Sequence, residues 1–175
     1  LSSMVRAAGI RAGCYTSPHL LSLKERFQVD GHSISSDGLE AHLDAVLAAA
    51  DALVGAGDVD HHPSYYEILT AVAFRYFAEA RVELAVLEVG LGGRLDATNV
   101  TVPRVAIITP ISLDHTDCLG DDIRQIADGD DPSVRRHHRQ GADRQRGFPL
   151  KIGAYQRQID SLAIHRNLGD TNTVI

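Results

Sequence analysis

Cysteine and long apolar runs are scarce in this sequence. Its 175 residues include two cysteines, Cys14 and Cys118, and no apolar run approaches the roughly 20 residues that a membrane-crossing helix requires. Two cysteines so far apart in the chain exclude a disulfide framework and a CxxC metal or redox motif. The first residues also lack the basic and apolar segments of a signal peptide. We therefore expect a cytoplasmic protein without a membrane partner.

A basic excess is absent as well. Lys and Arg total 17 against 23 Asp and Glu, which gives a formal net charge of −6. Proteins that neutralise phosphates carry a concentrated basic face, so nucleic acid is not expected as a partner. The charge is unevenly divided, with net −8 over residues 1–127 and net +2 over 128–175. A hydrophobic content of 44% is typical of a globular protein and too high for a disordered chain.

Helical and strand patterns alternate along the first 127 residues. The expected elements are helices that end near Gly9 and span about 36–54 and 64–79, and strands at 10–15, 27–31, 84–89 and 105–109. The last two strands are near-continuous apolar runs, which are typical of strands buried on both faces of a parallel sheet. We therefore predict an α/β fold with three layers, in which a mostly parallel sheet is flanked by helices.

Polar residues follow the last two expected strands, where ligands bind in such sheets. Glu88 interrupts the first apolar run, and a desolvated carboxylate there needs hydrogen bonds, a cation or a proton. A buried salt bridge is the structural alternative to a functional role. The glycines at 90, 92 and 93 lack the third glycine of GxGxxG, because Leu95 stands in its place. A tight turn and a ligand-binding loop both stay open for this segment.

His115 lies just past the last expected strand, between Asp114 and Asp117. A neutral imidazole ligates a metal or relays a proton, and the carboxylates would orient it; a loop histidine that caps a helix is the other interpretation. A Glu–His pair suits Mg²⁺ only in part, because Mg²⁺ prefers oxygen ligands. A hydrolase triad of Ser112 or Cys118 with His115 is disfavoured, since no GxSxG elbow accompanies it.

Four blocks of this sequence together point to a known family. They are TSPHL at 16–20, YYEILTA at 65–71, LEVGLGGRLDATN at 87–99 and ITPISLDHTD at 108–117. In this order they resemble the folylpolyglutamate synthase/dihydrofolate synthase family of Mur-type amide ligases. The third block is the most specific, and it argues against a Mur-type ligase that acts on a cell-wall precursor.

The resemblance implies an ATP-dependent ligase. Such an enzyme adds L-glutamate to the carboxylate of folate or dihydropteroate through an acyl phosphate, with ATP as co-substrate and Mg²⁺ as cofactor. By residue match, Glu88 and His115 are the catalytic pair that holds Mg²⁺ near the γ-phosphate. The matched positions for substrate binding are Thr16, Ser17, Pro18, His19, Tyr65, Tyr66, Asp96 and Ala97. The partners implied are small molecules, and we expect a monomer.

The sequence departs from the family in two places. It contains no GxxGKS-like or GKGS-like phosphate loop, so the resemblance covers an incomplete P-loop ATPase domain over residues 1–127. Residues 128–175 form a divergent tail, for which we consider disorder and a shifted reading frame. We expect this chain to be inactive alone. A non-catalytic α/β remnant or binding module, and another Mur-type ligase, stay open as alternatives.

Overall fold

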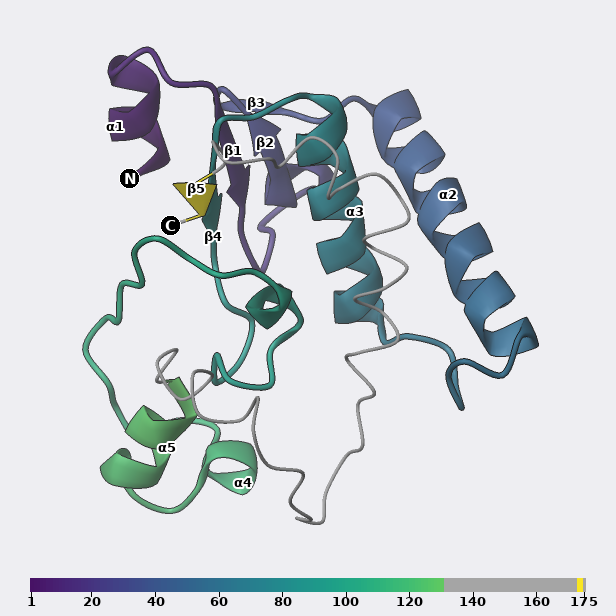
Figure 1. The fold of residues 1–175 in the computed structure, drawn as a ribbon. Helices are drawn as coiled ribbons and strands as arrows, with labels where there is room; N and C mark the ends of the chain where they lie inside the picture. Colours follow the sequence, from purple (N-terminus) through teal and green to yellow (C-terminus); the bar gives the residue numbers. More distant parts are fainter. Residues whose placement is uncertain (131–172, 175) are drawn as a thin grey trace.

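A five-stranded mixed sheet forms the centre of the described residues, 1–130 and 173–174, in a computed structural model (Figure 1). The strand order is β3-β2-β1-β4-β5. β1 (Ala12–Tyr15) pairs in parallel with β4 (Leu84–Leu87), which pairs in parallel with β5 (Thr173–Val174). β2 (Phe27–Val29) pairs antiparallel with β1 and with β3 (His32–Ser33). The α/β class is confirmed, with parallel and antiparallel pairs in one sheet.

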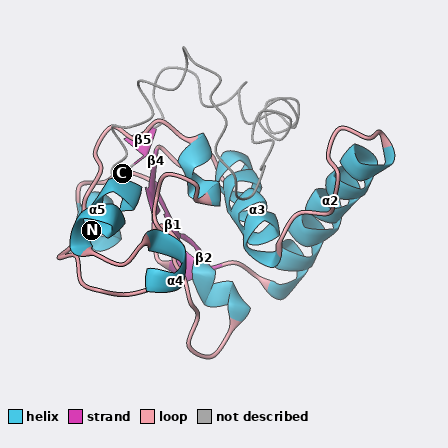
Figure 2. Cartoon of the chain, turned by 90° about the horizontal axis from the view of Figure 1, so that it is seen from below, coloured by secondary structure: helices cyan, strands magenta, loops and turns pink. Residues whose placement is uncertain are grey.

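Helices flank the sheet on both sides (Figures 1 and 2). They are α1 (Ser2–Ala7), α2 (Ser36–Gly55), α3 (Tyr65–Glu79), α4 (Thr116–Leu119) and α5 (Ile123–Asp130), with short 3₁₀ helices η1 (Leu23–Arg26) and η2 (Ala97–Val100). α1 lies on one side of the strands, and α2 and α3 lie on the other. The three expected layers are therefore present. The core fills the space between the sheet and α3, where Leu69 and Val72 are fully buried.

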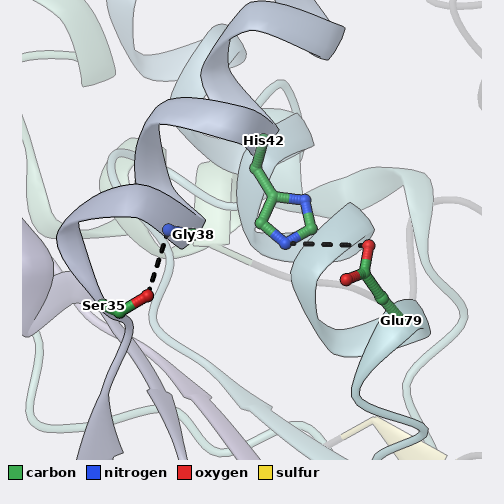
Figure 3. A network of polar contacts seen from close by, with 4 residues as sticks. All are labelled: Ser35, Gly38, His42 and Glu79. Atoms are coloured by element: carbon green, nitrogen blue, oxygen red, sulfur yellow. Dashed lines mark hydrogen bonds and ion pairs between the residues drawn. The ribbon is translucent and has the colours of Figure 1, made fainter.

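The two long helices lie where the sequence predicts them, and both begin at serine caps. Ser35 caps α2, because its Oγ accepts a hydrogen bond from the Gly38 amide at 3.0 Å (Figure 3). At α3, Ser64 and Glu67 form a reciprocal capping box, in which Ser64 N donates to Glu67 Oε2 at 2.7 Å. Glu67 therefore has the structural role that its position in the first turn indicates.

The predicted strand at 27–31 is present as β2, and a tight hairpin turn follows it. Asp30 (φ 51°) and Gly31 (φ 80°) join β2 to β3, and positive φ at two successive residues is typical of the hairpin turn that matches strand twist. Asp30 Oδ1 also accepts a hydrogen bond from the Ala12 amide at 2.9 Å. The turn is thereby fixed to the start of β1.

The predicted strand at 105–109 is wrong. The structure has no strand there, and Val105, Ile107 and Ile108 are 48%, 60% and 53% exposed. β1 occupies one edge of β4, and β5 occupies the other at Leu84 and Ala85, so the segment has no neighbour that satisfies its backbone groups. An apolar run predicts burial, but it does not supply a pairing partner.

Most of the expected tail lies outside the described residues. Of 128–175, the structure describes 128–130, which complete α5, and the two residues of β5, which the sequence did not predict. The hypotheses of disorder and of a shifted reading frame concern the residues between these. Among the described residues, no helix combines the length and apolarity that crossing a membrane requires.

A buried histidine joins the two long helices. His42 of α2 is 5% exposed, its Nδ1 has no hydrogen-bond partner, and its Nε2 lies 4.0 Å from Glu79 Oε2 of α3 (Figure 3). The ring also packs edge-on against Tyr76, with centroids 5.6 Å apart. Burial lowers the pKa of His42; Glu79 opposes this effect and Arg75 adds to it. The neutral imidazole is therefore the folded form.

We expect His42 to make stability depend on pH. In the unfolded chain this side chain takes up a proton near pH 6.5, whereas the folded protein resists protonation to a lower pH. The free energy of unfolding should therefore be full above about pH 6.5 and should fall as the pH drops toward the folded pKa. Urea unfolding of the wild type and H42F between pH 5 and 8 measures this, since phenylalanine removes the proton site and keeps the ring packing. The exposed His61 supplies the control H61F, which should keep the wild-type slope. An H42F slope equal to the wild type's would contradict the prediction.

Candidate functional site

The carboxyl ends of β1 and β4 meet at one edge of the sheet, and the candidate site lies there. The Ser17 amide, in the loop after β1, donates a hydrogen bond to Glu88 Oε2 at 2.8 Å. The Glu88 amide in turn donates to the Tyr15 carbonyl at 2.9 Å. Two blocks that lie about 70 residues apart are thus joined through Glu88. Parallel pairing makes this possible, because it brings both strand ends to the same edge.

Glu88 is not buried in a strand, which corrects the sequence interpretation. β4 ends at Leu87, and Glu88 lies just beyond it, where its contacts are open to solvent. Desolvation therefore does not explain the choice of a carboxylate at this position. A buried salt bridge does not explain it either, because none of the ion pairs among the described residues involves Glu88. One carboxylate oxygen binds the Ser17 amide, and the other has no protein donor in the described part of the chain.

The loop after Pro18 is held by Glu25 of η1. Its carboxylate accepts hydrogen bonds from the amides of Leu20, Leu21 and Ser22 at 2.9, 3.1 and 2.8 Å. These bonds, those from Leu20 and Ser22 most, lower the pKa of Glu25. Sequence reasoning missed this residue, although Ser22 and Glu25 have the spacing of a capping box, which is a readable signal. The tip of the loop projects into solvent, with Leu20 90% and Leu21 94% exposed.

Tyrosines from β1 and α3 form the wall beside Glu88. The rings of Tyr15 and Tyr66 have centroids 6.2 Å apart, and Tyr15 Oη lies 3.3 Å from Thr70 Oγ1. Tyr66 Oη donates to the Glu88 carbonyl at 3.4 Å. Burial, with smaller contributions from Asp96 and Tyr15, raises the pKa of Tyr66 well above its usual range. Both hydroxyls therefore keep their protons at neutral pH.

Asp96 fixes the glycine-rich turn that follows Glu88. Its Oδ2 accepts from the amides of Gly90 and Leu91, both at 3.0 Å, and its Oδ1 accepts from the Thr98 amide at 2.9 Å and from Thr98 Oγ1 at 2.5 Å. Asp96 is 7% exposed, so these four donors offset the cost of burying its charge. The carboxylate thus acts as the N-cap of η2 and ties η2 to the end of β4.

A cavity of about 310 Å³ lies beside the glycine-rich turn. Its lining includes residues 89–93, 107–112, Asp114, His115, Leu119 and Ile126. His115 is the N-cap residue of α4, with φ 50°, and its amide donates to Asp114 Oδ1 at 2.8 Å. The side chain of His115 is 59% exposed and makes no cap hydrogen bond. Glu88 is not among the residues that line this cavity, whereas the next residue, Val89, is.

The structure joins Ser17, Tyr66, Glu88 and Asp96, among the predicted site residues, into one connected group. Hydrogen bonds among the described residues link Ser17 to Glu88 and Tyr66 to Glu88. A further bond links Gly90, two residues after Glu88, to Asp96. The other predicted binding residues are sequence neighbours of these four: Thr16, Pro18 and His19 in the loop, Tyr65 at the start of α3, and Ala97 at the start of η2. No hydrogen bond or ion pair among the described residues joins His115 to this group, and His115 lines the cavity beside the glycine-rich turn. No set of three or more His, Cys, Asp or Glu side chains in the described residues is placed to hold a metal ion.

This chain is similar in sequence and fold to several known proteins. A curated Mycobacterium tuberculosis protein, "Dihydrofolate synthase/folylpolyglutamate synthase", is 46% identical over 132 residues, which is 73% of this chain and 27% of that protein. A solved structure described as Escherichia coli FolC in complex with DHPP and ADP matches with 38% identity and a TM-score of 0.64, over 74% of this chain and 29% of that one. A solved Mycobacterium tuberculosis folylpolyglutamate synthase with ADP and AMPPCP matches with 34% identity and a TM-score of 0.70, over 99% of this chain and 38% of that one.

The matches cover only a part of each relative's length. The chain spans between 15% and 33% of the curated relatives that it matches. No protein-family model matches the chain. What the relatives' whole lengths accomplish is therefore a separate question from the similarity of this part.

Proposed function

Because this chain belongs to the folylpolyglutamate synthase/dihydrofolate synthase family, we propose that it forms the folate-side part of an ATP-dependent ligase that adds L-glutamate to a pteroyl or folyl carboxylate. The observation that carries this proposal is the connected group at the carboxyl ends of β1 and β4. Three blocks shared with the family meet there through Glu88, Tyr66 and Asp96. The proposed ligase part is residues 1–127. The similar structures with DHPP and ADP support small-molecule substrates of this class.

Each member of the group has a proposed task. The loop at 16–19, Tyr65, Tyr66, Asp96 and Ala97 would shape the pocket for the pteroyl part of the substrate. Tyr66 would act as a neutral hydrogen-bonding wall, because burial keeps its proton on. Asp96 would act mainly through the turn that it fixes, since both of its oxygens already accept from protein donors. The carboxylate of Glu88 would face the reacting phosphate.

Mg²⁺ would take two ligands from this chain, and one carboxylate with an imidazole suits it only in part, because Mg²⁺ prefers oxygen ligands. The groups proposed to hold it are the Glu88 oxygen that has no protein donor among the described residues and the His115 imidazole. Mg²⁺ usually takes one or two protein carboxylates and completes its shell with water and substrate phosphates, so a larger protein cage is not required. When bound, it would supply neutralisation of the phosphate charge. Glu88 would keep its orientation through the Ser17 amide.

Ligand binding by the 175-residue chain tests the proposal. We expect pteroate to bind with micromolar affinity in isothermal titration, and a UDP-linked cell-wall precursor not to bind. Y66L should weaken pteroate binding by about tenfold, because it removes a hydroxyl and a ring from the pocket wall. Y76L, on the same helix but beside His42, is the matched control and should bind as the wild type does. Binding of the cell-wall precursor in place of pteroate would overturn the proposal.

Turnover by the chain alone is expected to be absent. The sequence has no glycine-rich loop with lysine and serine to surround the β- and γ-phosphates. ADP release should therefore stay at background with ATP, L-glutamate and either pteroate or tetrahydrofolate. Measurable release that depends on all three substrates would contradict the claim that such a loop is essential.

A further inference from the structure

Arg26 is the one arginine or lysine that is buried among the described residues. It ends η1, and it is 8% exposed. Its Nε donates to His19 Nδ1 at 3.0 Å, and its guanidinium carbon lies 6.0 Å from the centre of the Tyr65 ring. It also lowers the pKa of the neighbouring Tyr15 hydroxyl, against the larger effect of burial. Arg26 is therefore in contact with the same loop and tyrosines that form the candidate site.

The positive charge of Arg26 has no negative partner in the described part of the protein. All ion pairs among the described residues involve histidine, and none involves Arg26. Glu25 is adjacent in sequence, but its carboxylate accepts from the amides of the loop instead. A guanidinium keeps its charge at any physiological pH, and burying a charge is costly unless an opposite charge is close. His19 and Tyr65 provide a hydrogen bond and a ring face, but neither neutralises the charge.

Asp96 is the buried acidic side chain among the described residues, and it can be compared with Arg26. Four donors from the protein satisfy that carboxylate, as described above. The Nε of Arg26, by contrast, donates to a ring nitrogen that carries no negative charge. Asp96 thus has its hydrogen-bond donors within the protein, whereas Arg26 forms no ion pair with any carboxylate of the described residues, and an anion from outside would neutralise its charge. Arginine suits a carboxylate in particular, because its planar fork donates two parallel hydrogen bonds.

We propose that Arg26 binds the carboxylate of the pteroyl substrate and so determines specificity for an acid over its uncharged analogue. This inference rests on the proposed function, because it names the residue that reads the charge of that same substrate. The sequence blocks that match the family do not include Arg26. The Tyr65 ring beside Arg26, 61% exposed, provides the surface for the aromatic part of the ligand.

A pair of ligands separates recognition of the carboxylate from general damage to the site. Pteroate and 6-anilinomethylpterin differ only in the carboxyl group, and both are titrated into the 175-residue wild type, R26M and R26K. We expect R26M to lower the affinity for pteroate by tenfold or more and to change the affinity for the analogue by less than about twofold. R26K should restore part of the lost affinity, because lysine keeps the charge but not the fork. R75M is the matched control, since Arg75 lies beside His42, away from the loop, and it should bind both ligands as the wild type does.

The possible results decide between distinct conclusions. If R26M weakens both ligands equally, Arg26 only holds the loop, and the inference is overturned while the proposed function stands. If R26M changes neither, the inference also fails. A wild type that binds neither ligand overturns the proposed function and the inference together. Thermal unfolding of each variant shows whether it is folded, and R26K carries the test if R26M is not.

Discussion

Replacing Asp96 with alanine is expected to lower the free energy of unfolding by about 2–3 kcal/mol. The carboxylate is buried and accepts four hydrogen bonds, so its removal leaves the amides of Gly90, Leu91 and Thr98 without their partner. Hydrogen bonds to a charged group are worth more than neutral ones, and groups that lose a partner in a partly buried place pay a desolvation cost. Urea unfolding followed by circular dichroism measures the effect.

Two further variants sharpen this prediction. D96N keeps the shape and one acceptor oxygen, so it should lose about half as much stability as D96A. The matched control is D122A, because Asp122 also accepts from two backbone amides, those of Arg124 and Gln125, but is exposed. D122A should cost about 0.5–1 kcal/mol. If D96A costs no more than D122A, the bonds of Asp96 do not hold the glycine-rich turn. Hydrogen exchange at the Gly90 and Leu91 amides should accelerate in D96A and stay unchanged in D122A.

The second large effect on stability is expected where Phe77 packs against Gly13. Phe77 of α3 is 3% exposed, and a Cβ added to Gly13 of β1 would lie 3.0 Å from the ring atoms Cδ1 and Cγ. The ring therefore packs directly on the strand where a side chain would stand. F77A should destabilise the protein by about 3–5 kcal/mol, because it removes a large buried side chain and leaves a cavity. G13V should cost about 1–3 kcal/mol through overpacking.

Because these two residues share one space, their effects should not add. In the double variant, the isopropyl group that G13V introduces occupies part of the cavity left by F77A. The total cost should therefore fall below the sum of the single variants by about 1 kcal/mol or more. The control cycle pairs G13V with F74A, since Phe74 is also buried on α3 but is not among the atoms nearest to Gly13. That pair should be additive within about 0.5 kcal/mol. Additive effects of G13V and F77A would refute direct packing of the ring on Gly13.

Local signals were sufficient for most elements of the fold. The apolar spacing over 36–54 and 64–79 predicted α2 and α3, because a helix is stabilised largely by residues within one or two turns of each other. The run at 105–109 is nearly continuous in apolar residues, as is the run that forms β4. It nevertheless forms no strand, because pairing depends on a neighbour, and β1 and β5 occupy the two edges of β4.

In the candidate site, too, some residues could be identified from local sequence signals and others only from the tertiary structure. Glu88 was identified for the wrong reason, since burial was inferred from an apolar run that ends one residue earlier. Glu25 could have been found from its capping-box spacing with Ser22, but the amides that it binds in the loop could not. Arg26 has no local feature that distinguishes it from a surface charge. Its burial follows from the loop at 17–22, which folds back over η1.

The sequence by itself determined the α/β class, the helix starts and the family, because these depend on spacing and residue type along short stretches. Only the tertiary structure decided which charges are solvated and which are buried. Glu88 is open to water, Asp96 is satisfied by four protein donors, and Arg26 is buried without an acid among the described residues. The physical reason is that the energy of a charge depends on the groups that surround it in space, and these come from segments up to about 70 residues away.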